Sequence, residues 1–390
     1  MIKLPKSVEF IISRLEAFGH RADIVGGCVR DRLLNKEPGD YDITTDATPD
    51  EMREIFSDMR TIDTGIKHGT LTVLVDSVPY EITTYRLDGE YSDNRHPDKV
   101  SFTRKLSDDL SRRDFTVNAM CYNYTHGFTD LFGGVNDLNA RTIRAVGDPH
   151  LRFTEDALRI LRALRFASVL DFNIEENTSA AIRKTAELLK NVSKERIYIE
   201  WKKLISGIAA HRILNEYQDV ISLIIPQLSG FSLPDEKLFT KADADIRELS
   251  LFAAGGSSAF IDAMSSLKCD NKHKNYGALV LENLSFPTDT ETDMKLLLIK
   301  SGADGAKGVI KLKILLGLSD SKKLRELEEI LQNGVCISIS DMKINGSDLI
   351  SLGFHGKEIG DMLGRLLIMI AENKLKNERE ELLRAVAMYH

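Results

Sequence analysis

Two aspartates in alternating positions, Asp40 and Asp42, follow a glycine pair, Gly26-Gly27, at a spacing that could bind a metal ion beside a phosphate group. Residues two apart in an extended strand point to the same face, with backbones about 6.6 Å apart, so the two carboxylates would converge. Magnesium binds a few carboxylate oxygens together with substrate phosphates. The stretch therefore predicts a nucleoside triphosphate site with Mg²⁺ as its cofactor, held by Asp40 and Asp42.

The chain around these aspartates predicts the elements that must position them. The apolar run before Gly26 predicts a strand, and the glycine pair permits a tight turn and a close approach of the backbone to a ligand. Cys28 to Leu34 predicts a short helix whose free N–H groups would face an anion. Gly27 is therefore a candidate nucleotide-binding residue. Arg30, in the first turn after it, is placed to pair with two oxygens of a triphosphate.

A third candidate carboxylate, Glu81, lies in a predicted strand, Tyr80 to Arg86. A single Glu in an edge strand is solvated as often as it is functional, so both interpretations stay open for it. In nucleotidyl transfer, metal ions bridge the nucleophile and the phosphate oxygens. Asp40 and Asp42, with Glu81 as the candidate third member, are therefore the predicted catalytic residues. They would hold ions that activate the attacking hydroxyl and neutralise the departing pyrophosphate.

Two downstream segments carry further charged residues. By itself, Ser111 to Met120 predicts a capped helix, with Asp114 as the cap and the arginines in solvent. The other segment lies within a predicted helix, Thr154 to Phe166, which by itself could be an ordinary solvated surface helix. Its charged residues recur every three positions and would follow one ridge of that helix: Asp156, Arg159, Arg162 and Arg165.

The order and spacing of these motifs resemble the nucleotidyltransferase superfamily that includes DNA polymerase beta. Within it, Gly26-Gly27-x-Val29-Arg30-Asp31 is similar to the class II group, which contains bacterial tRNA CCA-adding enzymes and poly(A) polymerases. The resemblance implies that Ser111 to Met120 recognises the nucleotide sugar, with Arg113 contacting the nucleotide. Asp114 could then accept a hydrogen bond from the ribose 2′-hydroxyl. It also implies that the helix from Glu155 is a template that selects the base.

The template has a physical logic in Asp156 and Arg159, which are neighbours on one face of the predicted helix. Cytosine and adenine both present an amino donor beside an unprotonated ring nitrogen, so a carboxylate can accept from the first and a guanidinium can donate to the second. Guanine and uracil present the reverse pattern, which would leave buried polar groups unpaired and cause rejection by roughly 10⁴. We therefore expect CTP and ATP as substrates. Arg162 and Arg165 would meet phosphate or brace the template.

The resemblance leaves more than one activity open. A polar loop between Arg86 and Ser111, expected to be mobile, accompanies terminal A addition in the class II family, so it argues against a CC-only enzyme. The Arg-rich insertion of bacterial poly(A) polymerases is absent, because Thr61 to Thr70 stands in its place. We expect untemplated addition of CCA to the 3′ end of tRNA, with release of pyrophosphate. An A-adding enzyme is the first alternative, and a poly(A) polymerase or a non-catalytic RNA-binding protein is less favoured.

Near the C-terminus, Ile344 to Ile350 and Gly353 to Gly360 place glycine turns before predicted helices. N–H groups at such turns can contact RNA phosphates, although a packing turn explains the pattern equally well. The stretch resembles the tail of class II enzymes that holds the tRNA elbow, with His355-Gly356-Lys357 in place of the usual Pro-Gly-Pro. Gly356 and Lys357 are therefore candidate RNA-binding residues.

Composition and patterning limit the architecture. The 390 residues are 43% hydrophobic and 28% charged, which allows a core of ordinary size. Alternating apolar strands occur up to about residue 150, and helical periodicity dominates after it. We expect an elongated protein with an α+β nucleotidyltransferase head, similar to polymerase beta, over residues 1–150. An all-α neck (151–205), body (206–300) and tail (301–390) would follow it.

Hydropathy and cysteine spacing exclude several protein classes. No apolar run approaches the roughly 18 residues that span a bilayer, and the N-terminus lacks a signal-peptide layout. We therefore expect a cytoplasmic protein, with neither membrane nor DNA among its partners. The four cysteines are far apart and form no C-x-x-C pair, so they predict neither a zinc site nor a disulfide framework. The net charge of −7 means that contact with tRNA requires a local basic surface.

Overall fold

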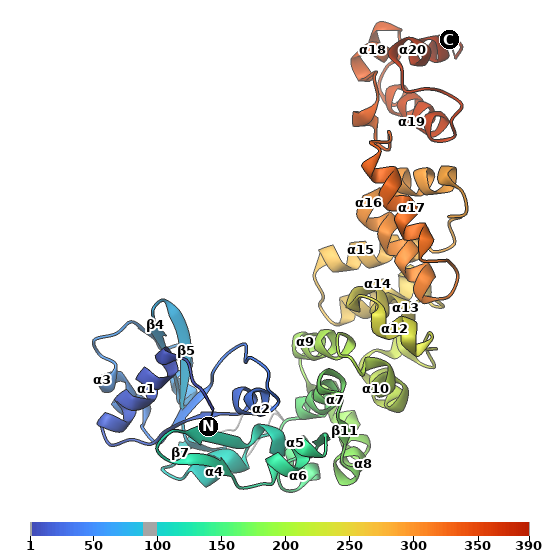
Figure 1. Cartoon of the computed structure of the whole chain (residues 1–390). Helices are drawn as coiled ribbons and strands as arrows, with labels where there is room; N and C mark the ends of the chain where they lie inside the picture. Colours follow the sequence, from blue (N-terminus) through green and yellow to red (C-terminus); the bar gives the residue numbers. More distant parts are fainter. Residues whose placement is uncertain (1, 89–99, 390) are drawn as a thin grey trace. The chain divides into compact units, whose positions relative to one another are not determined.

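The computed structural model describes residues 2–88 and 100–389. The chain divides into two compact units, Met1–Ile224 and Ile225–His390. Every strand of the described residues lies in the first unit, and the second unit consists of helices and their connections (Figure 1). The expected class, an α+β head followed by helical segments, is confirmed.

Seven strands form one mixed sheet in the order β3-β4-β5-β2-β1-β8-β9. β2 and β5 are parallel, and the other neighbours are antiparallel. The pairs β6-β7 and β10-β11 form two small sheets. The bounds of the strands are β1 Ala22–Val25, β2 Ile43–Thr45, β3 Thr61–Ile62, β4 Thr70–Val75, β5 Val78–Thr84, β6 Arg86–Asp88, β7 Val100–Phe102, β8 Met120–Asn123, β9 Gly127–Asp130, β10 Thr142–Ile143 and β11 Asn173–Ile174.

Aligned isoleucines hold the centre of the large sheet on its core. Ile24 of β1 is paired with Ile43 of β2, and Ile43 is paired with Ile82 of β5. All three are at most 1% exposed, and burial of each such side chain stabilises the fold by roughly 1.5–3 kcal/mol. Since β2 and β5 are parallel, the same register brings Asp42, one residue before Ile43, beside Glu81, one residue before Ile82. Core packing therefore sets the relative positions of two predicted catalytic carboxylates.

The predicted helix from Cys28 to Leu34 is confirmed as α2. The first unit contains further helices beside its sheets. Their bounds are α1 Lys6–Ala17, α2 Gly27–Leu33, α3 Pro49–Ile55, α4 Leu106–Ser111, α5 Gly134–Asn139, α6 Pro149–Glu155, α7 Leu158–Leu170, α8 Glu176–Thr185, α9 Lys194–Ile205, α10 Ala210–Glu216 and α11 Gln218–Ile224, with 3₁₀ turns at Ile66–His68, Thr116–Asn118 and Ala186–Asn191.

The predicted strand through Asp40 and Asp42 begins later than expected, because β2 starts at Ile43. The alternation of the side chains nevertheless extends back from the strand. Tyr41 is buried, whereas Asp40 and Asp42 on either side of it are exposed. The Asp42 carbonyl also accepts the N–H of Val25 at 3.0 Å, which continues the β1-β2 pairing by one residue.

The prediction of one continuous helix from Thr154 to Phe166 is wrong. α6 ends at Glu155, α7 starts at Leu158, and Asp156 between them has extended backbone with φ −135° and ψ 102°. The Asp156 carboxylate accepts the N–H of Leu158 at 3.1 Å. A short polar side chain that bonds to a nearby backbone N–H in this way competes with continued helix. Asp156 therefore does not lie on one helical ridge with Arg159.

Two further expectations need correction. The segment between Arg86 and Ser111, predicted as a loop, pairs its ends as β6 and β7 and continues into α4. Residues 89–99 of that segment lie outside the described residues. The neck, predicted as all helical, contains β11, which pairs in parallel with β10 of the head.

The second unit is helical throughout its described residues. α16 is interrupted at Gly302, where φ is 68°, and the last helices enclose a separate core that includes Leu349, Leu366 and Leu382. Its helices are α12 Glu236–Lys241, α13 Ala244–Leu251, α14 Gly256–Ser266, α15 Asn271–Glu282, α16 Glu291–Leu315, α17 Lys322–Gln332, α18 Gly346–Ser351, α19 Lys357–Ala371 and α20 Arg379–Ala387, with 3₁₀ turns at Pro226–Leu228 and Ile339–Asp341.

Two chain-wide expectations are consistent with the described residues. All four cysteines are buried and free of disulfide bonds. Over residues 2–88 and 100–389, no helix combines the length and apolar character needed to cross a bilayer.

The packing of α7 against α9 generates a stability prediction at Gly207. A Cβ at this position would lie 2.1 Å from Ser168 Oγ and 2.5 Å from its backbone carbon. Because backbone cannot move aside easily, Gly207→Ala should destabilise the first unit by roughly 1–3 kcal/mol. Urea unfolding followed by circular dichroism measures this. Gly39→Ala is the control, since nothing lies within 4 Å of its Cβ. Equal stability of the two variants would contradict the prediction.

Candidate active site

A pocket of about 220 Å³ contains the predicted carboxylates Asp42 and Glu81, as the β2-β5 register requires. Its floor comes from central strands of the sheet, so the carboxylates stand on a rigid support. The residues that line it are Val25, Asp42, Ile43, Thr70, Glu81, Thr83, Arg86, Arg112 and Arg113.

The charges around Asp42 suit a bound cation. Loss of hydration raises the pKa of the Asp42 carboxyl, and the negative charge of Asp40 raises it further. Glu81 acts in the same direction, while the Arg113 guanidinium opposes both. A divalent ion would relieve this repulsion among three carboxylates. Asp40 thus acts on Asp42 through its charge, although it is not among the described residues that line the pocket.

Metal binding here would need oxygens from outside the protein. Within residues 2–88 and 100–389, no group of three His, Cys, Asp or Glu side chains could hold a metal ion unaided. Magnesium commonly keeps waters and takes phosphate oxygens of its substrate beside one or two carboxylates. The donor set therefore fits an ion that binds together with a nucleoside triphosphate.

A second pocket, of about 300 Å³, contains the predicted base-selecting residues Asp156 and Arg159. Its lining joins the head to α7 and α9 within the first unit, and it is strongly basic. The residues that line it are Arg86, Arg112, Arg113, Asp114, Asp156, Leu158, Arg159, Arg162 and Arg196.

Three arginines, Arg86, Arg112 and Arg113, line both pockets. We call the pocket with Asp42 the carboxylate pocket, and the pocket with Asp156 the base pocket after its predicted role. The two pockets are therefore contiguous, and the surface common to them is positively charged. Guanidinium groups bind phosphate oxygens through paired N–H donors. A nucleotide with its base in one pocket and its phosphates beside the carboxylates of the other would meet this basic surface along the way.

The buried carboxylate of Asp114 forms an ion pair with Arg162 of α7, whose side chain is partly exposed. One carboxylate oxygen, Oδ2, accepts from Arg162 Nε at 2.8 Å and from Nη2 at 2.6 Å, and Oδ1 accepts from the Phe115 N–H and the Asn118 amide. Burial alone would raise the pKa of Asp114, but Arg162 outweighs it and lowers that pKa to about 2. The carboxylate of Asp114 thus braces the head against α7. Its assignment to a ribose hydroxyl gains no support from this arrangement.

Asp156 is fixed by two groups from different elements. Its Oδ1 accepts the Leu158 N–H, and its Oδ2 accepts from Arg196 Nη2 of α9 at 3.0 Å. Arg159 is 8% exposed and donates to Glu155 at 2.8 Å and to the backbone carbonyl of Arg112 at 2.9 Å. Both predicted template residues therefore lie in one pocket, held by cap and ion-pair contacts instead of by a shared helical ridge.

Arg30 and Arg165 are engaged elsewhere. Arg30 donates to Asp31 at 2.8 Å and 2.9 Å and to Asn118 at 2.6 Å. Arg165 pairs with Glu200 at 3.0 Å, and its guanidinium lies 3.9 Å from the centre of the Phe166 ring. Neither belongs to the described lining of either pocket. Their contacts are with other residues of the first unit.

Sequence reasoning missed Arg86, Arg112 and Arg196 as pocket residues. Arg112 stands beside Arg113 in the predicted sugar motif, and this neighbourhood was a usable signal. Arg196 lies 40 residues after its partner Asp156, so no local pattern connects them. Its Nη1 is buried without a hydrogen-bond partner in the described structure. Such an unused donor is costly unless a ligand completes it.

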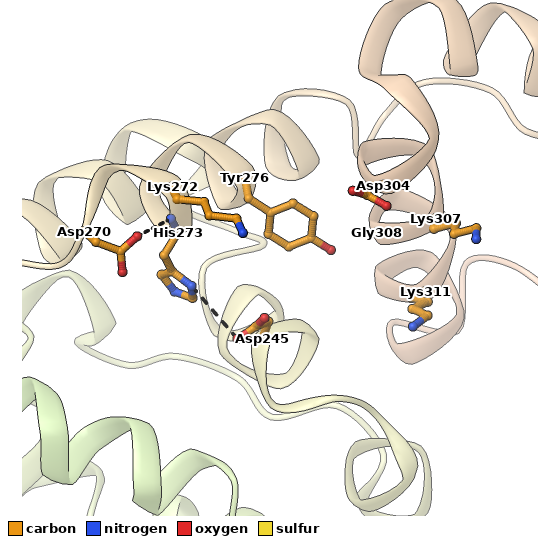
Figure 2. Close-up of a pocket in the computed structure, with 9 residues that line it drawn as sticks. All are labelled: Asp245, Asp270, Lys272, His273, Tyr276, Asp304, Lys307, Gly308 and Lys311. Carbon is orange, nitrogen blue, oxygen red and sulfur yellow. Dashed lines mark hydrogen bonds and ion pairs between the residues drawn. The ribbon is translucent and has the colours of Figure 1, made fainter. Parts of the chain in front are cut away.

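In the second unit, Gly356 and Lys357 are exposed at the start of α19. Gly356 has φ 56°, a conformation that glycine adopts without strain. A separate pocket of about 430 Å³ lies between α13, α15 and α16 (Figure 2). Three lysines and three aspartates line it, and its His273 is paired with Glu248 at 2.6 Å. These balanced charges contrast with the basic surface of the first unit.

Comparison with known proteins assigns the chain to a family. The poly A polymerase head domain model matches residues 22–144, a polymerase A model for an RNA and SrmB binding site matches residues 171–220, and a tRNA nucleotidyltransferase domain 2 model matches residues 246–386. The CCA-adding enzyme of Enterococcus faecalis is 37% identical over 387 residues, which span 96% of this chain and 93% of that enzyme. This chain belongs to the CCA-adding enzymes. It is thus a tRNA nucleotidyltransferase, and the resemblance inferred from its motifs is confirmed.

Other members of the CCA-adding family agree with this assignment. The enzyme of Pediococcus pentosaceus is 36% identical over 389 residues, 96% of each chain. The crystal structure of the Bacillus stearothermophilus CCA-adding enzyme in complex with CTP is 29% identical and superimposes with a TM-score of 0.82, covering 99% of this chain and 98% of that one. Membership of this nucleotidyltransferase family implies that the enzyme uses a divalent metal, which agrees with the cluster of carboxylates around Asp42.

The Asp114–Arg162 pair should make the first unit sensitive to acid. Because the folded-state pKa of Asp114 is lowered to about 2, its charge stabilises the fold above pH 4 by about 2 kcal/mol, and this contribution is lost as pH falls toward 2. Asp114→Asn should therefore be less stable than the unmodified chain at pH 6, by a margin that shrinks below pH 4. Urea unfolding at several pH values measures it. With Asp219→Asn as the exposed control, a margin independent of pH would contradict the assignment.

Proposed function

We propose that this chain adds C, C and A in turn to the 3′ end of tRNA, using CTP and ATP, with Mg²⁺ bound by Asp40 and Asp42. One observation carries the proposal: the carboxylate pocket and the base pocket share Arg86, Arg112 and Arg113. A nucleoside triphosphate has its base at one end and its phosphates at the other. It therefore fits a site in which the base pocket, the three arginines and the carboxylate pocket follow one another. The CTP complex of the B. stearothermophilus relative supports the choice of nucleotide.

The reaction transfers a nucleotide to a hydroxyl. The 3′-hydroxyl of tRNA attacks the α-phosphate, the bond to the β-phosphate breaks, and pyrophosphate leaves. Bound Mg²⁺ supplies a lowered hydroxyl pKa and neutralises charge on the phosphates. Asp40 and Asp42 would hold the ions, with Glu81 as the candidate third carboxylate. Arg113, together with Arg112, balances the charge of the triphosphate.

Base selection is assigned to Asp156 and Arg159 in the second pocket. The carboxylate accepts from the amino group shared by cytosine and adenine, and the guanidinium donates to the adjacent ring nitrogen. Arg162 lines the same pocket and pairs with Asp114, and Arg165, outside the described lining, pairs with Glu200. Gly27 and Arg30 are assigned to the turn beneath the nucleotide, where a Cβ at Gly27 would lie 3.6 Å from Arg30 Nη2.

The tRNA itself extends beyond the active site. Gly356 and Lys357, exposed at the N-terminus of a 15-residue helix, are proposed to contact its phosphates. We assign the head to residues 1–150, the neck to 151–205, the body to 206–300 and the tail to 301–390. A tRNA substrate, with no membrane or DNA partner, agrees with action in the cytoplasm.

Full CCA addition and A-only addition differ in one assay. A tRNA that lacks CCA is offered with CTP alone, and the product is resolved on a sequencing gel. We expect two C residues to be added, and then a terminal A when ATP is supplied. Failure to incorporate C while a tRNA ending in CC still receives A would show an A-adding enzyme.

Loss of a metal carboxylate should abolish turnover. Asp42→Ala is expected to lower the rate of nucleotide addition by more than about 100-fold, because even partners of metal ligands cost 10–100-fold when replaced. Binding of tRNA, measured by filter retention, should stay within about twofold, since RNA contacts lie elsewhere. Asp50→Ala is the control, because Asp50 is exposed at the start of α3. Turnover that survives Asp42→Ala would remove the metal assignment.

Loss of either template side chain, the Asp156 carboxylate or the Arg159 guanidinium, should weaken the selection of the base. Asp156→Ala and Arg159→Ala are each expected to raise the incorporation of UTP and GTP relative to CTP and ATP, because the mismatched donors and acceptors no longer meet a fixed partner. Competition assays with mixed nucleotides measure the ratio, and Asp219→Ala serves as the exposed control. Unchanged selectivity in both variants would show that the base is chosen elsewhere.

A further inference from the structure

Asp109 of α4 is a completely buried carboxylate that the proposed reaction does not use directly. It is 0% exposed. Its Oδ1 accepts from Arg112 Nε at 3.0 Å and Nη2 at 2.6 Å, and its Oδ2 accepts from Arg113 Nη2 at 3.1 Å and Thr44 Oγ1 at 3.2 Å. One buried group therefore binds the two adjacent arginines that line both pockets.

The cost of burying this charge indicates what it does. A carboxylate removed from water loses several kcal/mol of hydration, and ion pairs recover this only when geometry and hydrogen bonding are good. Asp109 has four such donors, and the attraction of Arg113 and Arg112 overcomes the burial that would otherwise raise its pKa. Its oxygens are occupied, and it is not among the described lining of either pocket. It is thus suited to act on the nucleotide through the arginines.

Arg113 retains donors that Asp109 does not take. Its Nη2 is bonded to Asp109, whereas its Nε is buried without a hydrogen-bond partner in the described structure. Its Nη1 lies 3.2 Å from the Cβ position of Gly26, next to the glycine turn. The ion pair therefore fixes one edge of the guanidinium, while Nε remains an unused donor.

Thr44 connects the same carboxylate to the metal-binding strand. Thr44 lies in β2, two residues after Asp42, and its hydroxyl oxygen is 3.2 Å from both Asp109 Oδ2 and the Thr83 carbonyl of β5, so its single proton is shared between these two acceptors. Asp109 therefore links the two arginines to β2, which begins directly after Asp42, and through Thr44 to β5, which carries Glu81.

We propose that Asp109 is a positioning residue that orients Arg112 and Arg113 toward the β- and γ-phosphates of the bound nucleotide. The inference rests on the proposed function, in that it takes the ligand to be a nucleoside triphosphate. Since CTP and ATP have the same triphosphate, the effect of Asp109 is independent of the base. Base selection, which depends on Asp156 in the other pocket, does not involve it.

The test compares nucleotides that differ only in their phosphates. Isothermal titration of the full chain with Mg²⁺ measures binding of CTP, ATP and cytidine 5′-monophosphate. Asp109→Asn should weaken CTP and ATP by a similar factor of about 10 or more, because charge-assisted pairs are lost, and should change monophosphate binding little. In turnover, KM for both nucleotides should rise while the preference for CTP over UTP is kept. Asp108→Asn, the same change at the adjacent half-exposed residue, is the matched control.

Other outcomes overturn the proposal. If Asp109→Asn lowers the unfolding temperature but binds CTP as the unmodified chain does, Asp109 is only structural. If monophosphate and triphosphate binding weaken equally, Asp109 does not act through the outer phosphates. Should Asp109→Asn not fold, Thr44→Val removes one donor to Asp109 and should weaken CTP and ATP equally, by a few-fold. Because binding needs no tRNA, failure of CCA addition by the unmodified chain would refute the proposed function separately.

Discussion

The ion pair between the buried carboxylate of Asp114 and Arg162 is the constraint on which the active site depends. It joins the head to α7, and it holds the base pocket next to the carboxylate pocket. Breaking such a pair by removing one partner typically costs 3–5 kcal/mol, because a charge is left buried and unpaired. The same pair explains why Asp114, in the segment expected to recognise the nucleotide sugar, contacts a neighbouring helix. The ion pair holds together two parts of the site whose residues are 48 positions apart in the sequence.

Electrostatic balance organises the rest of the first unit. Carboxylates gather around Asp42, where we propose that a cation binds, and arginines gather where we propose that the phosphates bind, with Arg112 and Arg113 held by Asp109. Neither group is neutralised fully inside the protein. A triphosphate with its metal ion supplies both missing charges, so the site is complete only with substrate. This accounts for a binding surface that is locally basic in a chain whose net charge is −7.

Much of this could be predicted from the sequence, and the misses have physical causes. The strand, glycine turn and helix from Ala22 to Leu33 are local structures, and their residue pattern was sufficient to predict them. The helix through Asp156 was mispredicted because periodicity cannot register a side chain that bonds to Leu158 and Arg196 instead of continuing the helix. Arg30 was expected at the triphosphate because its place after the turn is local information. Its contact with Asn118, 88 residues away, is not.

The sequence by itself determined the family, the reaction class and the order of the motifs, because these depend on residue types at short spacing. It also identified Asp40, Asp42 and Glu81 as candidate catalytic carboxylates. Only the tertiary structure decided that β2 and β5 pair in parallel and bring the last two of these together, that Arg196 completes the base pocket, and that Asp109 binds two arginines at once. Those contacts join different elements, and their geometry follows from packing of the whole unit, which no local pattern encodes.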